Sequence, residues 1–228
     1  MLVIKTLGGL EIRLNGRPVI DIGSRKGEAL LVYLAVENGS MPRGVLANLL
    51  WPESSQRHAS ASLRVALSKL HKALSDYVVI GRETVQINPQ ADVYVDIRDL
   101  EEKLSKGEIE PALRLYQGDF LAGFQVVDSG SFEDWQRDQN TRLSVLTHDV
   151  LQAAVIQAID TGDHDFALKI AQHLLDVDPL DEKTLQLAMQ LHALKGDRTA
   201  ALEQYEAFAA LLKSELAVSP LPDTINLY

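Results

Sequence analysis

The spacing of apolar residues changes several times along the chain, and each change marks a predicted element. Over the first 20 residues apolar and polar positions alternate with the period of two that is typical of β-strands. This alternation predicts strands at residues 2–4 and 10–14. The dipeptide Asn15-Gly16 predicts a hairpin turn that leads to a third strand at Val19-Ile20.

Three segments with the helical period of 3.6 residues follow these strands. Ser24 is a suitable N-cap for a first helix that runs to about Val36. Pro42 fits the first turn of a second, short helix. A third helix is predicted from about Gln56 to Leu74, where apolar residues again recur every three to four positions.

A further hairpin and a change of composition end this part of the chain. Short apolar runs at residues 77–80 and 84–87 predict two strands joined by Gly81-Arg82-Glu83. Asn88-Pro89 and the acidic composition that follows place a boundary near residue 92. Residues 1–92 therefore form one predicted domain, in the order strand–strand–strand–helix–helix–helix–hairpin.

Residues 93–228 are almost entirely helical in pattern and contain a repeat. Gly162-Asp163 recurs 34 residues later as Gly196-Asp197, and an Ala-Leu pair follows each glycine five residues on. A weaker copy at Gly107-Glu108 keeps the same spacing. A 34-residue period is typical of tetratricopeptide-like helical hairpins. The predicted fold class is mainly α with small β elements.

Composition narrows the class of protein. The chain is 46% hydrophobic and 24% charged, as in ordinary globular proteins. It has no cysteine, which excludes disulfides and thiolate metal sites. No apolar run approaches the roughly 18 residues of a membrane helix, and the N-terminus is unlike a signal peptide. We therefore expect a soluble, cytoplasmic protein with no membrane partner.

The net charge of −10 conceals an asymmetry between the two parts. Residues 1–95 hold 11 basic and 8 acidic side chains, a net charge of +3. Residues 96–228 hold 11 basic and 24 acidic side chains, a net charge of −13. Such an asymmetry suggests that the first part meets an anion, although a charge of +3 alone is equally compatible with chance.

The sequence offers little for catalysis. No phosphate-binding glycine loop, nucleophile elbow or His-x-x-x-His pair is present. The acidic residues between 176 and 182 lack the central glycine and terminal glutamate of a calcium loop, so they are interpreted as a solvated turn. We expect no enzyme activity, no metal and no cofactor.

The third predicted helix carries the most informative pattern. Leucines at 63, 67, 70 and 74 fall on one face and predict a buried stripe. The opposite arc carries small hydroxyl and basic side chains, and residues 54–75 contain no Asp or Glu. Such a face suits contacts to phosphates and base edges. Val65, in the middle of that arc, could contact a thymine methyl or simply be a surface valine.

Five stretches resemble a known family when they are taken together in this order and spacing. They are Leu49-Leu50-Trp51-Pro52-Glu53, residues 62–74, residues 115–121, Phe132-Glu133-Asp134-Trp135 and residues 215–220. Residues 1–92 resemble the OmpR-like winged-helix DNA-binding domain. Residues 93–228 resemble the bacterial transcriptional activator domain of the Streptomyces antibiotic regulatory protein (SARP) family.

The resemblance implies a transcriptional regulator, most often an activator, that binds double-stranded DNA and recruits RNA polymerase. It places the recognition helix at about 57–74 and the wing at about 77–87. The residues expected to contact DNA are Arg43, Arg57, Ser62, Arg64, Val65, Ser68, Lys69, Lys72 and Arg82. In the loop 51–56, the residues expected to contact polymerase are Trp51, Glu53 and Gln56. A homodimer, or monomers side by side on direct repeats, would bind the operator.

Three departures from the family pattern stand out. His71 replaces the usual Arg, which weakens one phosphate contact or makes it sensitive to pH. Asn140 and Ala217 replace an Arg and a Gly, at positions that concern packing of the activator domain. The chain stops at Leu227-Tyr228, where longer relatives continue, so it is either a short member or a fragment.

A protein-interaction scaffold is the alternative from another functional class. In that case the winged helix would bind protein, and the acidic repeat domain would bind a basic peptide. The acid-free third helix favours DNA over this alternative.

Overall fold

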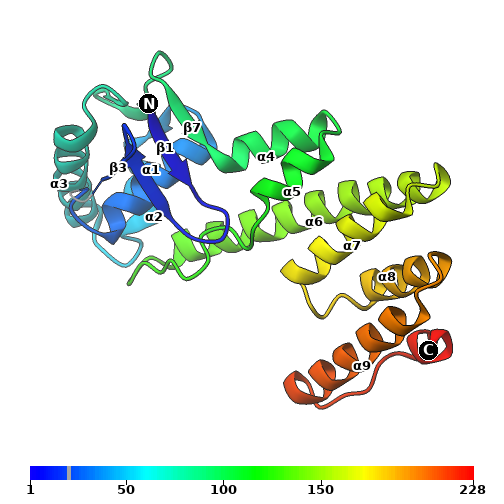
Figure 1. Cartoon of the computed structure of the whole chain (residues 1–228). Coiled ribbons are helices and arrows are strands. Elements are labelled where there is room, and N and C mark those ends of the chain that lie inside the picture. The colour runs from blue at the N-terminus through cyan, green and yellow to red at the C-terminus, as the bar shows by residue number, and fades with distance from the viewer. Residues whose placement is uncertain (20–21) are drawn as a thin grey trace. The chain divides into compact units, whose positions relative to one another are not determined.

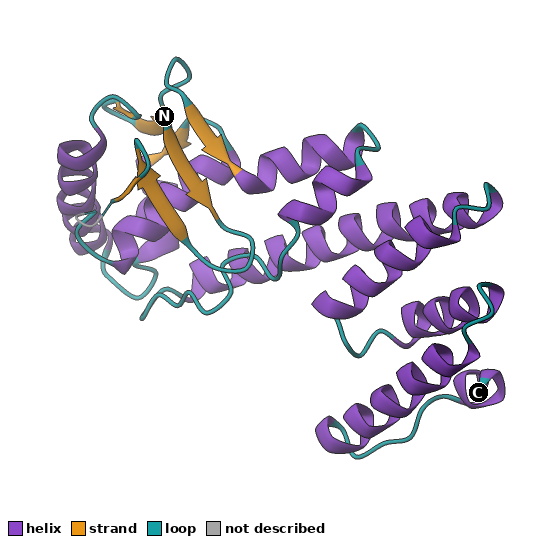
Figure 2. Ribbon diagram, viewed as in Figure 1, coloured by secondary structure: helices purple, strands orange, loops and turns teal. Residues whose placement is uncertain are grey.

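The computed structural model describes residues 1–19 and 22–228, which form two compact units (Figure 1). The units are Met1–Ser144 and Val145–Tyr228. Helix α6 (Gly130–Asp160) contributes its first half to one unit and its second half to the other. Helices predominate over strands, as the sequence predicts (Figure 2).

The first unit opens with the predicted strands, extended by one that the sequence did not predict. Strands β1 (Leu2–Lys5), β2 (Glu11–Leu14) and β3 (Arg17–Pro18) pair antiparallel. Strand β7 (Val93–Val95) pairs parallel with β1, giving the order β3-β2-β1-β7.

The third strand begins earlier than expected. Asn15 and Gly16 both have positive φ, as a two-residue hairpin turn requires, so pairing resumes directly at Arg17. The predicted strand at Val19-Ile20 was therefore placed too late. Ile20 itself lies outside the described residues.

Three helices follow close to their predicted bounds. Helix α1 (Arg25–Glu37) is capped by Ser24, whose hydroxyl accepts the Gly27 N–H, and α3 spans Gln56–Leu74 as expected. The prediction for Pro42 was slightly wrong. It has extended backbone angles and lies in strand β4 (Met41–Pro42), immediately before helix α2 (Arg43–Leu50).

A second small sheet joins β4 to the predicted hairpin. Strands β5 (Val78–Ile80) and β6 (Thr84–Ile87) pair antiparallel, and β4 adds to the free edge of β6. The leucine stripe of α3 is buried as predicted, at positions 63, 67, 70 and 74. It packs in the core formed with α1 and α2, which leaves the opposite face of α3 to solvent.

The buried carboxylate of Asp96 connects the two ends of the first 96 residues. Asp96 is 4% exposed and begins helix α4 (Asp96–Ser105). It accepts the backbone N–H groups of Thr6 (2.7 Å) and Leu7 (2.9 Å) and the Thr6 hydroxyl (2.8 Å). The chain beyond α5 (Ile109–Leu115) also binds the loop that contains Thr6, because the Leu121 N–H donates a hydrogen bond to the Thr6 carbonyl (2.6 Å). The first compact unit thus extends past residue 92.

The second unit contains helices α7 (His164–Val177), α8 (Glu182–Leu194), α9 (Arg198–Glu215) and α10 (Pro222–Leu227). Consecutive helices from α7 to α9 pack against one another (Figure 1). Asp178-Pro179 follows the end of α7, as predicted for a helix-stopping proline. This arrangement of helical hairpins agrees with the repeat in the sequence.

The repeated glycine–acid pair is a helix-turn device. In Gly162-Asp163 and Gly196-Asp197 each glycine has a φ near +80°, and each aspartate caps the next helix through the Phe166 or Ala200 N–H. In the weaker copy, Gly107 also has positive φ, but its acidic neighbour makes no capping hydrogen bond. Ala217 likewise has a positive φ of 56°, a conformation that favours glycine.

We expect Asp96→Asn to destabilise the first unit by about 3 kcal/mol, because in either orientation its amide NH2 group would face at least one backbone N–H donor, from Thr6 and Leu7 or from Ile97. Chemical denaturation followed by circular dichroism measures this change. Asp92→Asn is the matched control, since the Asp92 side chain is 75% exposed. Equal stability of the two variants would contradict the importance assigned to Asp96.

Candidate nucleic-acid interface

The outer face of α3 presents the predicted residues to solvent. Arg57, Arg64, Val65, Lys69 and Lys72 are exposed, as is Ser68, whereas Ser62 is half-buried. The side chain of Val65 is 59% exposed, so an apolar group lies among basic ones. The helix begins at Ser55, whose hydroxyl accepts the His58 N–H, and no carboxylate contributes to its first turn. The predicted surface is thus continuous along one helix.

The cations of this face keep their charge available for a ligand. Among the described residues, none of the four basic side chains on this face forms an ion pair with a carboxylate. Arg64 donates from Nε to the Ser60 carbonyl of its own helix, at 3.3 Å. The stem of Lys69 lies against Gly23, where an added β-carbon would clash with the Lys69 Cδ. Packing therefore restricts Lys69 more than Lys72.

The β5–β6 hairpin lies beside α3 and is held by Arg43. The Arg43 backbone N–H donates to the Glu83 carbonyl (2.9 Å), and its Nε donates to the Gly81 carbonyl (3.2 Å). Arg43 thus orients the hairpin turn in addition to the contact expected of it. Arg82 at the tip is 96% exposed, with a loose pairing of 3.8 Å to Glu83.

A pocket of about 360 Å³ lies between α3 and the hairpin. Its lining residues are Arg43, Arg64, Leu67, Ser68, His71 and Ile80. The helical pattern places Arg64 and Ser68 on one part of the third helix, but it does not bring Arg43 and His71 together. Their convergence depends on how α2 and β5 pack against α3, which a helical pattern alone does not reveal.

The start of the loop 51–56 is held by residues that sequence reasoning missed. Lys26 donates to the Leu50 carbonyl (2.7 Å) and to the Asp128 carbonyl (3.1 Å), and its ammonium lies 5.3 Å from the ring centre of Trp51. Burial lowers the pKa of Lys26, and the nearby charge of Asp128 partly opposes this effect. The Ser129 hydroxyl also donates to the Leu50 carbonyl (2.8 Å).

The three residues expected to contact polymerase differ in exposure. Trp51 is half-buried against Lys26, whereas Glu53 and Gln56 are exposed. The loop therefore combines an anchored first residue with an accessible polar remainder.

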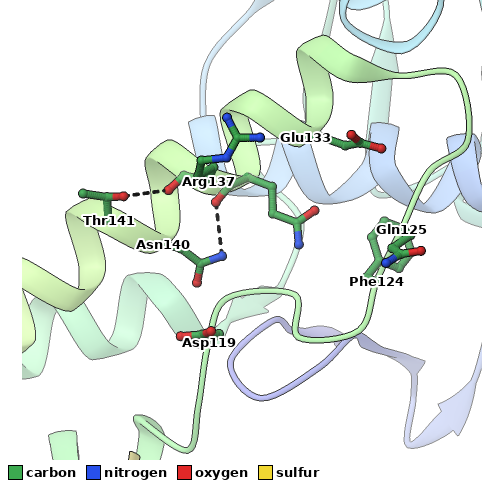
Figure 3. Close-up of a pocket in the computed structure, with 8 residues that line it drawn as sticks. Asp119, Phe124, Gln125, Glu133, Arg137, Asn140 and Thr141 are labelled. Carbon is green, nitrogen blue, oxygen red and sulfur yellow. Dashed lines mark hydrogen bonds between the residues drawn. The ribbon is translucent and has the colours of Figure 1, made fainter. Parts of the chain in front are cut away.

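A second, polar pocket of about 500 Å³ lies between the loop after α5 and the start of α6 (Figure 3). Its polar groups are largely engaged in holding the chain. Asn140 accepts the Phe120 N–H (2.7 Å) and donates to the Phe120 carbonyl (3.0 Å), which confirms the packing role predicted for it. Thr141 donates to the Arg137 carbonyl, and Arg137 pairs with Asp134 (both 3.0 Å).

Neither metal-binding clusters nor membrane spans are found in the part of the chain that the structure describes. Within residues 1–19 and 22–228, no three His, Cys, Asp or Glu side chains are grouped so that they could hold a metal ion. None of the described helices combines the length and apolar character needed to cross a bilayer.

The fold and this surface define a mainly helical protein in which small sheets support a basic helix and are followed by helical hairpins. The model of the bacterial transcriptional activator domain matches residues 98–228, more than half of the chain. The chain belongs to this family. The match confirms the resemblance of the second part of the chain to the bacterial transcriptional activator domain.

Similar proteins include regulators from two bacterial genera. The regulatory protein AfsR of Streptomyces coelicolor is 27% identical over 88% of this chain, and AfsR of Streptomyces griseus is 26% identical over 93%. The chain spans only 21% and 23% of those two proteins. The transcriptional regulatory protein MoaR1 of Mycobacterium tuberculosis is 24% identical over 97% of this chain, which covers 76% of MoaR1.

A solved structure has a similar fold. EmbR of Mycobacterium tuberculosis, determined in complex with a low-affinity phosphopeptide, superposes with a TM-score of 0.66 at 21% identity. The similarity covers 99% of this chain and 63% of EmbR.

We expect Lys26→Met to lower the free energy of unfolding by about 1–2 kcal/mol, because two hydrogen bonds and the contact with Trp51 are lost while the aliphatic stem remains. Denaturant titration measures the loss. Lys72→Met, on the exposed face of α3, should change stability by less than about 0.5 kcal/mol. A Lys26 variant as stable as the Lys72 variant would refute the proposed support of the loop.

Proposed function

We propose that this chain binds double-stranded DNA as a sequence-specific transcriptional regulator. Residues 1–92 would act as an OmpR-like winged helix and residues 93–228 as the activator domain. The main support for this proposal is the exposed face of α3, which bears basic and hydroxyl side chains but no carboxylate and lies beside a hairpin. In this proposal α3 enters the major groove, and the hairpin contacts an adjacent groove or the backbone.

The side chains divide into two roles. Arg43, Arg57, Arg64, Lys72 and Arg82 would contact phosphates, because a point charge or a planar guanidinium fixes register without reading sequence. The base readers would be Ser62, Val65, Ser68 and Lys69. Hydroxyl and ammonium groups hydrogen-bond base edges, and an apolar side chain such as Val65 suits a thymine methyl.

The loop 51–56 would be the surface presented to RNA polymerase, and the mechanism would be recruitment. Support comes from the anchoring of Trp51 by Lys26, which leaves Glu53 and Gln56 accessible next to the DNA-contacting helix. A loop held at its first residue loses less conformational entropy on binding than an unsupported one. This supports the activator role over simple occlusion of a promoter.

Assembly and location follow from the proposed binding to DNA. A homodimer, or adjacent monomers on direct repeats, would double the number of base contacts. A regulator that binds bacterial DNA acts in the cytoplasm, and its mechanism needs neither an enzymatic step nor a cofactor. The charge of −13 on residues 96–228 would be repelled by DNA, which favours contact through the first part.

Selection from a random-sequence duplex library at two salt concentrations tests the proposal. We expect enrichment of a short repeated motif and a steep loss of retention at the higher salt concentration. The spacing of the repeats then distinguishes a two-fold dimer from monomers in tandem. No retention at low salt would contradict DNA binding and favour the protein-interaction scaffold.

The variant Lys72→Ala should weaken binding to the selected duplex about fivefold near physiological salt, because one fewer counterion is released. Its melting temperature should stay unchanged, since the side chain is exposed. Lys69→Ala should also lower affinity. Lys213→Ala, on exposed α9, is the matched control and should bind as the unmodified chain does. Full affinity in a Lys69→Ala/Lys72→Ala double variant would exclude α3 as the recognition helix.

A further inference from the structure

We propose that a pocket between α7 and α9 binds a basic, amphipathic peptide segment of a protein partner. The segment would place one large apolar side chain in the pocket and donate a hydrogen bond to Gln204. The pocket lies entirely within the second unit, Val145–Tyr228. It is separate from helix α3, and its occupancy does not require the proposed binding of DNA.

This pocket has a volume of about 200 Å³, an apolar floor and an open rim. The floor consists of Leu185 and Phe208, two buried members of the hydrophobic cluster of the second unit. Exposed residues form the rim, so the pocket is open to solvent; they are Gln172, Pro179 and Ala207. The remaining lining residues are Leu175, Gln204 and Leu211. Pockets for whole small molecules usually begin at about 300 Å³, so this volume suits a single side chain of a larger partner.

A chain of side-chain amides connects the pocket to a carboxylate. Gln204 Nε2 donates to Gln172 Oε1 (2.9 Å), which joins α9 to α7. Gln172 Nε2 in turn donates to Asp176 Oδ1 (3.4 Å). In the part of the chain that the structure describes, Gln204 Oε1 is buried and accepts no hydrogen bond. The carboxylate thus lies at one end of the chain of amides and an unpaired acceptor at the other.

The unpaired oxygen of Gln204 indicates what the partner must supply. A buried acceptor without a hydrogen bond raises the free energy of the folded chain, and a bound N–H group would lower it. Because hydrogen bonds in a chain polarise one another, the Asp176 carboxylate makes Gln204 Oε1 a stronger acceptor. Charged N–H groups form stronger hydrogen bonds than neutral ones, so a lysine or arginine side chain is the favoured donor.

The charge around the pocket also favours a basic partner. The second unit has 13 acidic side chains and five Lys or Arg side chains, a net charge of −8. No lysine or arginine is directly adjacent in the sequence to a residue that lines the pocket. The acidic residues in these adjacent positions are all exposed, and they are Asp176, Asp178, Glu203 and Glu206. This charge attracts a basic segment and repels nucleic acid.

Selection from a random peptide library displayed on phage, with the full chain as bait, tests the site. We expect the enriched peptides to be basic and to carry a leucine, methionine or phenylalanine within a few residues of a lysine or arginine. A fluorescent synthetic copy of an enriched peptide is then titrated with the full chain, and fluorescence anisotropy gives the dissociation constant. Binding should weaken as the salt concentration rises, because salt screens the attraction between exposed charges.

Two substitutions distinguish the pocket from other surfaces. Ala207→Trp obstructs the open rim and should weaken peptide binding about tenfold or more. Ala210→Trp, at an exposed position of α9 outside the lining, is the matched control and should bind as the unmodified chain does. Gln204→Met removes the unpaired acceptor and should weaken binding about tenfold without lowering the melting temperature, since no buried polar atom of this side chain is left unpaired.

The other outcomes each overturn the site. A library without enriched peptides, an enriched set that is not basic, or peptides that bind Ala207→Trp with full affinity would each rule it out. A sedimentation coefficient that rises with the concentration of the chain, and that Ala207→Trp makes constant, would assign the pocket to a second copy of this chain instead. The proposed DNA binding is tested separately, because Ala207→Trp should bind the selected duplex as the unmodified chain does.

Discussion

The hydrogen bonds to the buried carboxylate of Asp96 are the interaction on which the first unit depends. The carboxylate lies in the interior and accepts two backbone N–H groups from the loop after β1, together with the Thr6 hydroxyl. A buried charge is tolerated only when hydrogen bonds replace its hydration. Because these donors lie about 90 residues earlier in the chain, they join the sheet to the helices that follow β7. The same loop receives the Leu121 N–H, so the segment after α5 depends on this interaction as well.

Local signals account for the elements that the sequence predicted well. The bounds of α3 were predicted correctly because the leucine stripe continues without interruption and serines flank the helix. The repeat turns were predictable because each glycine supplies a positive φ and each aspartate caps the next helix. Strand β7 was not predicted, since three residues carry almost no periodicity and their partner β1 lies far away in the chain. The position of β3 was wrong because turn geometry, rather than apolar spacing, determines where pairing resumes.

The same distinction applies to the candidate interface. Its exposed cations could be listed from one helical pattern, because position on a helix determines which face a side chain occupies. The hydrogen bonds from Arg43 to the hairpin and from Lys26 to its partners could not be predicted in this way. Each of them joins two residues that are separated by 24 to 102 positions in the chain. Tertiary packing therefore contributes two features that the pattern omits, namely the pocket between α3 and the β5–β6 hairpin and the anchor of the loop after α2.

The Leu50 carbonyl at the end of α2 has an additional consequence. It accepts hydrogen bonds from Lys26 of α1 and from Ser129 of the segment before α6, so one backbone oxygen connects three parts of the chain. Two donors that share an acceptor are energetically linked, because loss of one changes the electron density and position available to the other. A displacement of the segment around Ser129 would therefore change the hydrogen bonding of Leu50, which directly precedes Trp51 in the chain. The segment before α6 and the start of the loop between α2 and α3 thus share one backbone acceptor, so that removing the Ser129 hydroxyl would alter the hydrogen bonding next to Trp51.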